Sequence, residues 1–316
     1  MANRGIRIPY QSGLVKTIYR LEPDVLVSDG FFQWSYATLW LRAFRKIAHV
    51  MCYQRTAHTE RNAQWYRLAY RRFVMRWIDA ICCSGRLCGE YVQGLGFPAE
   101  KITYGHITAD PVGLQRSLAK VTDKQVFELK NKYGLKGTIL LYVGRLIPRK
   151  GLRELLNAWK RFCAGVSDQK ATLLLVGDGP QRDELEQSVK QNGLVNVRFA
   201  GSVDYDSVSA YYKAADAFVI PTLEDNWSLV VPEAMACGLP ILCSEYNGCW
   251  PELVKPENGW VFDPLDRPAL VNTLKKCLSA RNRLGEMGER SKKIVSAYTA
   301  THAARAILEA CRIAMQ

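Results

Sequence analysis

Two carboxylates stand close together in the stretch TLEDNWSLVVPEAMACG, residues 222–238. Asp225 belongs to a polar loop after the apolar run 217–220, and Glu233 lies in a helix predicted over residues 228–237. Ligands of parallel α/β sheets bind beyond the carboxyl ends of the strands, where carboxylates can hold hydroxyl groups by charge-assisted hydrogen bonds. The stretch favours a site for a hydroxyl-rich ligand, although two acids on a solvated helix start would have the same spacing. Further candidate residues of this site are Glu224, Asn226, Trp227, Ser228 and Leu229.

A cationic turn, GRLIPRKG at residues 144–151, follows an apolar strand predicted over residues 138–143. Its first residue, Gly144, lets a ligand approach the backbone closely, and a helix opens after Gly151. The free N–H groups of a helix start, together with Arg145 and Lys150, make a good diphosphate site. Arginine and lysine are also common in solvated turns, and the stretch has neither P-loop spacing nor a GxGxxG fingerprint.

The cationic turn and the acidic stretch suit different parts of one ligand. Cations and helix N–H groups match a diphosphate, whereas carboxylates match the hydroxyl groups of ribose and of a hexose. This division predicts a nucleotide-diphospho-sugar as the ligand.

Four motifs in the C-terminal half resemble, in order, those of the family-4 retaining glycosyltransferases. They are GRLxxxKG at 144–151, VGDGP at 176–180 with Asp178, E-x7-E with EAMA at 225–236, and GGxxE…NG at 247–259. The resemblance covers the C-terminal half nearly end to end. It implies an α/β protein of GT-B type, in which two Rossmann-like domains with parallel sheets face a cleft.

The same resemblance implies a role for each matched residue. Arg145 and Lys150 would bind the donor diphosphate, Glu233 the ribose and Asp225 the donor sugar. Glu224 is the second choice for the sugar, because its spacing to Glu233 is one residue too long for the motif. In this family the cations neutralise the leaving diphosphate, so we expect no metal and no cofactor besides the nucleotide-diphospho-sugar co-substrate.

The N-terminal half matches the family pattern less closely. Asp29 stands where the family often has the last histidine of an HxHG stretch, so it is our candidate at the acceptor side. Arg55 and His58 follow the next predicted strand, either as cleft residues or as parts of a surface loop. His49 is expected to be structural. One helix at most, with a short strand, is visible before Val25, so the domain is either abbreviated or lacks its start.

Strands alternate with helical patterns throughout the chain, which favours parallel sheets covered on both faces. We expect an N-terminal acceptor-side domain at 1–115 and a linker with one helix at 116–137. The C-terminal nucleotide-sugar-binding domain would span 138–300, and a final helix at 301–316 would pack back toward the N-terminal domain.

The formal net charge of +13 suits nucleotide phosphates, an anionic membrane surface or nucleic acid. No nucleic-acid-binding motif accompanies it, so we expect no nucleic acid partner. Two stretches, 31–46 and 60–78, interleave aromatic with basic residues. We expect their aromatic side chains to form core and their arginines to face water, where they would attach weakly to an anionic membrane. The ten cysteines suggest free thiols in a reducing cytosol, and no apolar run could span a bilayer.

The family resemblance, together with this composition, implies a cytoplasmic retaining glycosyltransferase, peripheral at the inner face of the membrane. Its acceptor would be a glycan or a lipid-linked sugar, in polysaccharide or cell-envelope glycan synthesis. The alternative is a non-catalytic nucleotide-sugar-binding or scaffolding subunit.

Overall fold

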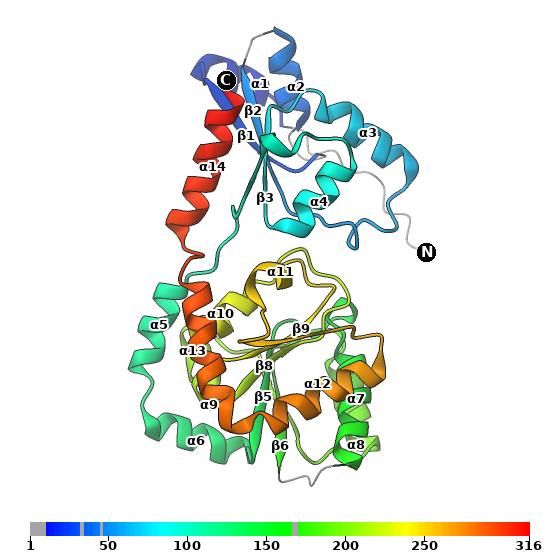
Figure 1. The fold of residues 1–316 in the computed structure, drawn as a ribbon, viewed down its shortest axis with the longest axis vertical. Coiled ribbons are helices and arrows are strands. Elements are labelled where there is room, and N and C mark those ends of the chain that lie inside the picture. Colours follow the sequence, from blue (N-terminus) through cyan, green and yellow to red (C-terminus); the bar gives the residue numbers. More distant parts are fainter. Residues whose placement is uncertain (1–10, 32–34, 45–46, 166–169) are drawn as a thin grey trace. The chain divides into compact units, whose positions relative to one another are not determined.

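The computed structural model describes residues 11–31, 35–44, 47–165 and 170–316. These residues fall into two compact units (Figure 1). The first unit comprises residues 1–107 and 301–316, and the second comprises residues 108–300. Each unit is built on its own parallel sheet, of four strands in the first and six in the second.

The four strands of the first unit lie side by side in chain order, β1-β2-β3-β4. Each neighbouring pair is parallel, so every connection must cross back to the start of the next strand, and a helix lies in each of these crossovers. The elements are α1 Leu14–Leu21, β1 Val25–Asp29, α2 Ser35–Phe44, β2 Ala48–Tyr53, α3 Trp65–Met75, β3 Ala80–Cys83, α4 Arg86–Gly94, η1 Ala99–Lys101, β4 Ile102–Tyr104 and α14 Ala300–Ala314.

Alternate residues of β2 and β3 face opposite sides of this sheet, as the strand period of two requires. Met51 and Ile81 point into a core shared with side chains of α3 and α4. Val50 and Ala80 point the other way, onto Ala306 of α14. The last helix of the chain thus covers one face of the first unit's sheet, which explains why residues 301–316 belong to that unit.

The six strands of the second unit follow the order β10-β9-β8-β5-β6-β7. The strands after β5 are added first on one side of it, as β6 and β7, and then on the other, as β8, β9 and β10. The position between β5 and β8 is therefore the switch point of this doubly wound sheet, and ligands of such sheets bind in the crevice beyond the carboxyl ends of the strands there. The elements are α5 Pro111–Lys120, α6 Asp123–Tyr133, β5 Thr138–Val143, η2 Pro148–Lys150, α7 Leu152–Ala164, β6 Ala171–Val176, α8 Arg182–Gln191, β7 Val197–Gly201, α9 Tyr205–Ala214, β8 Ala217–Ile220, α10 Val230–Ala236, β9 Ile241–Ser244, α11 Trp250–Leu253, β10 Gly259–Phe262, α12 Arg267–Ser279, η3 Arg281–Arg283 and α13 Leu284–Val295.

The segment 116–137, which we expected to be a linker with one helix, holds the C-terminal half of α5 and the whole of α6. Both pack on α9 within the second unit, and α5 also packs on α10. Thr122 begins α6 through a capping box with Gln125, a signal that the sequence carried and the prediction missed.

The aromatic side chains of α2 and α3 differ from the prediction. Trp40, Phe44 and Trp65 are largely exposed, whereas Phe31 is in the core. Conversely, Arg71 is 3% exposed and bound to Glu60 and Tyr91. The core-facing stripe of α3 holds Val74 and Met75, so the neighbouring aromatics are turned outward. The predicted aromatic positions 32 and 34 and the basic positions 45 and 46 lie outside the described residues.

Candidate functional site

Three loops of the second unit, at the carboxyl ends of β5, β6 and β8, are joined by close backbone contacts. Leu146, in the turn after β5, donates its backbone N–H to the carbonyl of Asp178 after β6, at 2.9 Å. Gly151 has a φ of +68°, and a Cβ at this position would collide with the carbonyl oxygen of Pro221 after β8. Only glycine fits such a close backbone approach. The cationic turn is therefore held against the acidic loop by backbone contacts.

The carbonyl of Arg149 fixes the register between these two loops. It accepts hydrogen bonds from the backbone N–H of Leu223 at 2.8 Å and from the hydroxyl of Thr222 at 2.9 Å. The Arg149 guanidinium in turn donates to the Glu224 carbonyl at 3.2 Å. This register places the next residue of the turn, Lys150, opposite the carboxylate of Asp225.

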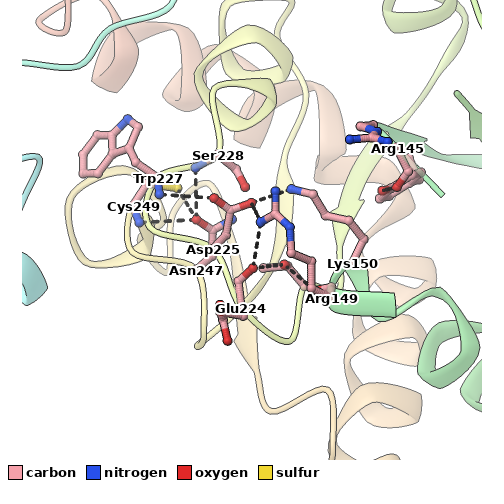
Figure 2. Close-up of polar contacts among 11 residues, drawn as sticks. Arg145, Arg149, Lys150, Glu224, Asp225, Trp227, Ser228, Asn247 and Cys249 are labelled. Atoms are coloured by element: carbon pink, nitrogen blue, oxygen red, sulfur yellow. Dashed lines mark hydrogen bonds and ion pairs between the residues drawn. The ribbon is translucent and has the colours of Figure 1, made fainter. Parts of the chain in front are cut away.

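Lys150 and Asp225 form an ion pair in which each side chain is 12% exposed (Figure 2). The Arg149 guanidinium lies 3.8 Å from the same carboxylate oxygen, and the backbone N–H of Trp227 donates to the other at 3.3 Å. Burial alone would raise the pKa of Asp225, but the charge and hydrogen bond of Lys150 outweigh it and hold that pKa below its ordinary value. The carboxylate is thus ionised at neutral pH and shared between cations.

A loop after β9 supports Asp225 from the other side. The Asp225 backbone N–H donates to the carbonyl of Tyr246 at 3.3 Å, and the Asp225 carbonyl accepts from Gly248 at 3.0 Å. The fully buried Asn247 lies between these two residues, and its side-chain oxygen accepts from the N–H groups of Ser228 and Cys249, each at 3.4 Å (Figure 2). Sequence reasoning treated Asn247 as part of a motif and did not assign it to the site.

Three buried polar atoms beside Asp225 have no hydrogen-bond partner within the described ranges. They are Oδ1 of Asn226, the hydroxyl oxygen of Ser228 and Nδ2 of Asn247. Buried polar atoms are nearly always hydrogen-bonded, so such a group of three needs an explanation. One acceptor, one hydroxyl and one amide donor around a carboxylate are suited to the hydroxyl groups of a sugar.

Glu233 lies in the first turn of α10, at the far end of the acidic stretch. The hydroxyl of the buried Tyr212, on α9, donates to its Oε2 at 3.1 Å and leaves Oε1 to another partner. Burial raises the pKa of Glu233 and this hydrogen bond partly opposes the rise. Tyr212 was missed by sequence reasoning, because an aromatic residue within a helix is usually interpreted as core.

The remaining predicted residues of the second unit differ in their surroundings. Arg145 is exposed, has no side-chain partner in the described part of the chain and lies apart from the Lys150–Asp225 contacts in Figure 2. Asp178 is exposed and pairs with Arg182 at 3.1 Å. Trp227 is buried, Leu229 is exposed, and Glu224 is half-buried.

The three candidates of the N-terminal half lie in the first unit. Asp29 is exposed at the end of β1, and the Nε of Arg55 lies 3.7 Å from Glu60. His58 is half-buried, and its carbonyl accepts from Arg61 at 2.6 Å. Their roles at the acceptor side remain predictions.

His49 has the surroundings of a structural residue. It is 1% exposed on β2, and its Nε2 lies 2.7 Å from the hydroxyl oxygen of Ser28 on β1. Its backbone N–H donates to Asp79 at 2.9 Å. Burial lowers the pKa of this imidazole to about 4, so the ring is neutral at neutral pH.

Two kinds of feature are not found among the described residues. No group of three or more His, Cys, Asp or Glu side chains is arranged to hold a metal ion. No helix there is long and apolar enough to cross a membrane.

Comparison with known proteins decides the family. The profile of the family described as glycosyl transferases group 1 matches residues 124–294, more than half of the chain. The chain belongs to this family. A second profile, described as a glycosyl transferase 4-like domain, matches residues 7–106 of the glycosyltransferase. The resemblance inferred from the four motifs is confirmed.

Curated relatives match mainly through part of their length. An uncharacterized glycosyltransferase of Methanocaldococcus jannaschii is 37% identical over 127 residues, which are 39% of this chain and 32% of that protein. The O-antigen chain mannosyltransferase B of Escherichia coli is 29% identical over 57% of this chain and 46% of its own length. The glycosyltransferase thus matches less than half of the length of these relatives.

Solved structures confirm the GT-B type of fold. The sucrose-phosphate synthase of Thermosynechococcus elongatus has a TM-score of 0.75 at 22% identity, over 94% of this chain and 76% of its own. HepE of Anabaena in complex with UDP has a TM-score of 0.77 at 20% identity, over 95% of this chain and 82% of its own. At such identities the likeness establishes the fold of the glycosyltransferase and not its substrate.

Proposed function

We propose that the protein transfers a sugar from a nucleotide-diphospho-sugar to an acceptor, with retention of the anomeric configuration. The observation that carries this proposal is the Lys150–Asp225 pair between the loops that follow β5 and β8. It places a cation and a carboxylate at the switch point of a doubly wound sheet, where such folds bind ligands.

The diphosphate of the donor would bind on the cationic side of this pair. Arg145 is exposed and free of other partners among the described residues, and Lys150 has further N–H groups besides the one that Asp225 accepts. Positive charge fixed beside the leaving diphosphate stabilises the charge that develops when the glycosidic bond breaks. We therefore propose that transfer needs neither a metal ion nor a cofactor.

The sugar and the ribose would bind on the acidic side. Asp225 and the unpartnered polar atoms of Asn226, Ser228 and Asn247 offer acceptors and donors to the sugar hydroxyls. Glu233, oriented by Tyr212, offers its second oxygen to the ribose. Bound in this way, the donor would extend from the β5 loop toward α10. Structural neighbours are described in complex with UDP and with UDP-glucose, which supports a nucleotide sugar as the donor.

The acceptor that we propose is a glycan or a lipid-linked sugar, handled by the first unit through Asp29, Arg55 and His58. A role in polysaccharide or cell-envelope glycan synthesis is supported by the O-antigen chain mannosyltransferase among the relatives. We place the protein in the cytoplasm, peripheral to an anionic membrane surface, because basic and aromatic side chains are exposed on its first unit.

A donor panel tests this function. The full chain is screened by thermal shift against UDP-, GDP- and ADP-sugars, and release of the nucleoside diphosphate is then followed for the donors that bind. We expect one donor class to stabilise the protein and to be hydrolysed slowly in water. NMR of the first-formed sugar should show the anomer of the donor. Stabilisation without hydrolysis or transfer would favour the non-catalytic binding subunit, and absence of any binding would contradict both functions.

A further inference from the structure

A cavity of about 440 Å³ lies in the first unit beside the C-terminal end of α3. Arg72 and Arg76, one helical turn apart, line it together with Lys101 at the end of η1. All three residues are exposed, and within the described ranges none of their side chains has an ion-pair or hydrogen-bond partner. Three cations without a neutralising carboxylate give this cavity an excess of positive charge that favours an anion.

The cavity is not polar throughout. Met75, Ile78 and Phe97 line it, and these residues belong to the core beneath α3 and α4. Apolar surface of this kind is a poor match for a fully hydrated ion, because the ion would leave that surface in contact with water and no free energy would be gained from burying it. It suits an anionic group that carries an apolar substituent.

The outer face of α3 extends this pattern beyond the cavity. Phe73 is 54% exposed and Trp77 is 42% exposed, and each directly follows one of the two cavity arginines in the sequence. Helices that lie at a membrane surface combine exposed aromatic side chains with basic ones in this way. Arg71 on the inner face of the same helix is buried and neutralised by Glu60, so unneutralised charge gathers on the outer face.

We infer that this cavity binds the phosphate of an anionic phospholipid headgroup, with Phe73 and Trp77 reaching into the bilayer interface beside it. The inference rests on the proposed function, which places the protein at an anionic membrane surface. It assigns the contact with the lipid to particular residues. The donor site in the second unit takes no part in it.

Flotation of the full chain with vesicles tests this site. The probes are vesicles of phosphatidylcholine mixed with phosphatidylglycerol, and vesicles of phosphatidylcholine alone. The cavity variant replaces Arg72, Arg76 and Lys101 by glutamine. The matched control replaces Lys275, Lys276 and Arg281 by glutamine, since these are also exposed and the net charge falls equally.

We expect the wild type and the control to bind the anionic vesicles, and the cavity variant to bind about 100-fold more weakly. This follows because each basic side chain near an anionic surface contributes a factor of about five. Arg76→Gln alone should lose about fivefold, and binding should fade as salt screens the charges. Equal losses in the two triple variants would overturn the inference, because net charge alone would then explain attachment. Failure of the wild type to float with the anionic vesicles would overturn it as well.

Two further arms separate the lipid from free phosphate and from misfolding. Phe73→Ala/Trp77→Ala should weaken vesicle binding yet retain affinity for dihexanoyl-phosphatidylglycerol, which is a soluble lipid with the same headgroup. If inorganic phosphate displaces that lipid completely at equal concentration, the site is one for free phosphate and the lipid assignment fails.

Nucleoside-diphosphate affinity, measured in parallel, should be unchanged in the cavity variant. A failure of the donor function would appear in that measurement and not in flotation.

Discussion

Removing the charge of Asp225 should tighten the binding of a free nucleoside diphosphate. In the structure, Lys150 is paired with this carboxylate, so a diphosphate that binds Lys150 must share the ammonium with Asp225. An ammonium that bridges two anions holds their oxygen atoms about 5 Å apart. Repulsion of two unit charges at that distance amounts to about 1–3 kcal/mol, for effective dielectric constants between that of water and about 20. Asp225→Asn removes this repulsion and retains a side chain of the same size.

We therefore expect Asp225→Asn to bind the nucleoside diphosphate at least fivefold more tightly than the wild type, as measured by calorimetry. Glu224→Gln is the matched control, because it removes the neighbouring carboxylate while the ion pair between Lys150 and Asp225 is kept. Its affinity should stay within about twofold of the wild type. Unchanged or weaker binding by Asp225→Asn would refute the view that Lys150 is shared between carboxylate and diphosphate.

Three other predictions concern separate groups. Arg145→Ala should weaken nucleoside-diphosphate binding by about 1.5 kcal/mol, the lower range for a charged hydrogen bond, whereas the exposed Arg161→Ala should not; equal affinities in calorimetry would remove Arg145 from the site. The pKa of Glu233 is raised in the folded protein, so the free energy of unfolding falls as the pH rises from the unfolded pKa through the folded one. Glu233→Gln should therefore raise Tm at pH 7 and not at pH 4, and it should weaken nucleotide binding. A Tm gain of equal size at both pH values would contradict this. His49 has a pKa of about 4 in the folded protein against 6.5 in the unfolded chain, so its full contribution to the free energy of unfolding is present above pH 6.5, and about 3 kcal/mol is lost as the pH drops toward 4. His49→Gln should lack this part of the acid dependence in urea titrations. An unchanged pH slope would show that other groups cause it.

The sequence was sufficient for β5 and β8, which match the apolar runs 138–143 and 217–220, and for the loops after them that carry the proposed donor site, because these depend on local patterns. An apolar run such as Ala171–Val176 is buried at every position, as expected for a parallel strand covered on both faces. The loops after β5 and β8 could be expected to meet, since neighbouring parallel strands end at the same edge of a sheet.

The pairing of Lys150 with Asp225 could not be predicted from the sequence. It depends on which backbone groups the two loops exchange, through the Arg149 carbonyl and the contact of Gly151 with Pro221. These contacts join residues 70 or more positions apart, and no local pattern encodes them. The support of Glu233 by Tyr212 was missed for the same reason.

The exposure of the aromatic side chains on α3 has a different cause. Helical periodicity would place an arginine outward, but Arg71 finds Glu60 and the hydroxyl of Tyr91 inside the unit. The buried Arg71, ion-paired with Glu60, occupies the inner face, and Phe73 and Trp77 remain outside. The choice between the two faces was made by tertiary partners that lie outside the helix.

Turnover of the selected donor by Asp225→Asn tests the central claim most directly, namely that the Lys150–Asp225 site carries out sugar transfer. Nucleoside-diphosphate release is followed for the wild type, Asp225→Asn and Glu224→Gln with the same donor. The account predicts steady release by the wild type and by Glu224→Gln, and near-complete loss in Asp225→Asn despite its tighter nucleoside-diphosphate binding, since a contact with the sugar counts most in the transition state. Full turnover by Asp225→Asn would contradict the account, and loss in Glu224→Gln alone would move the role to the preceding residue.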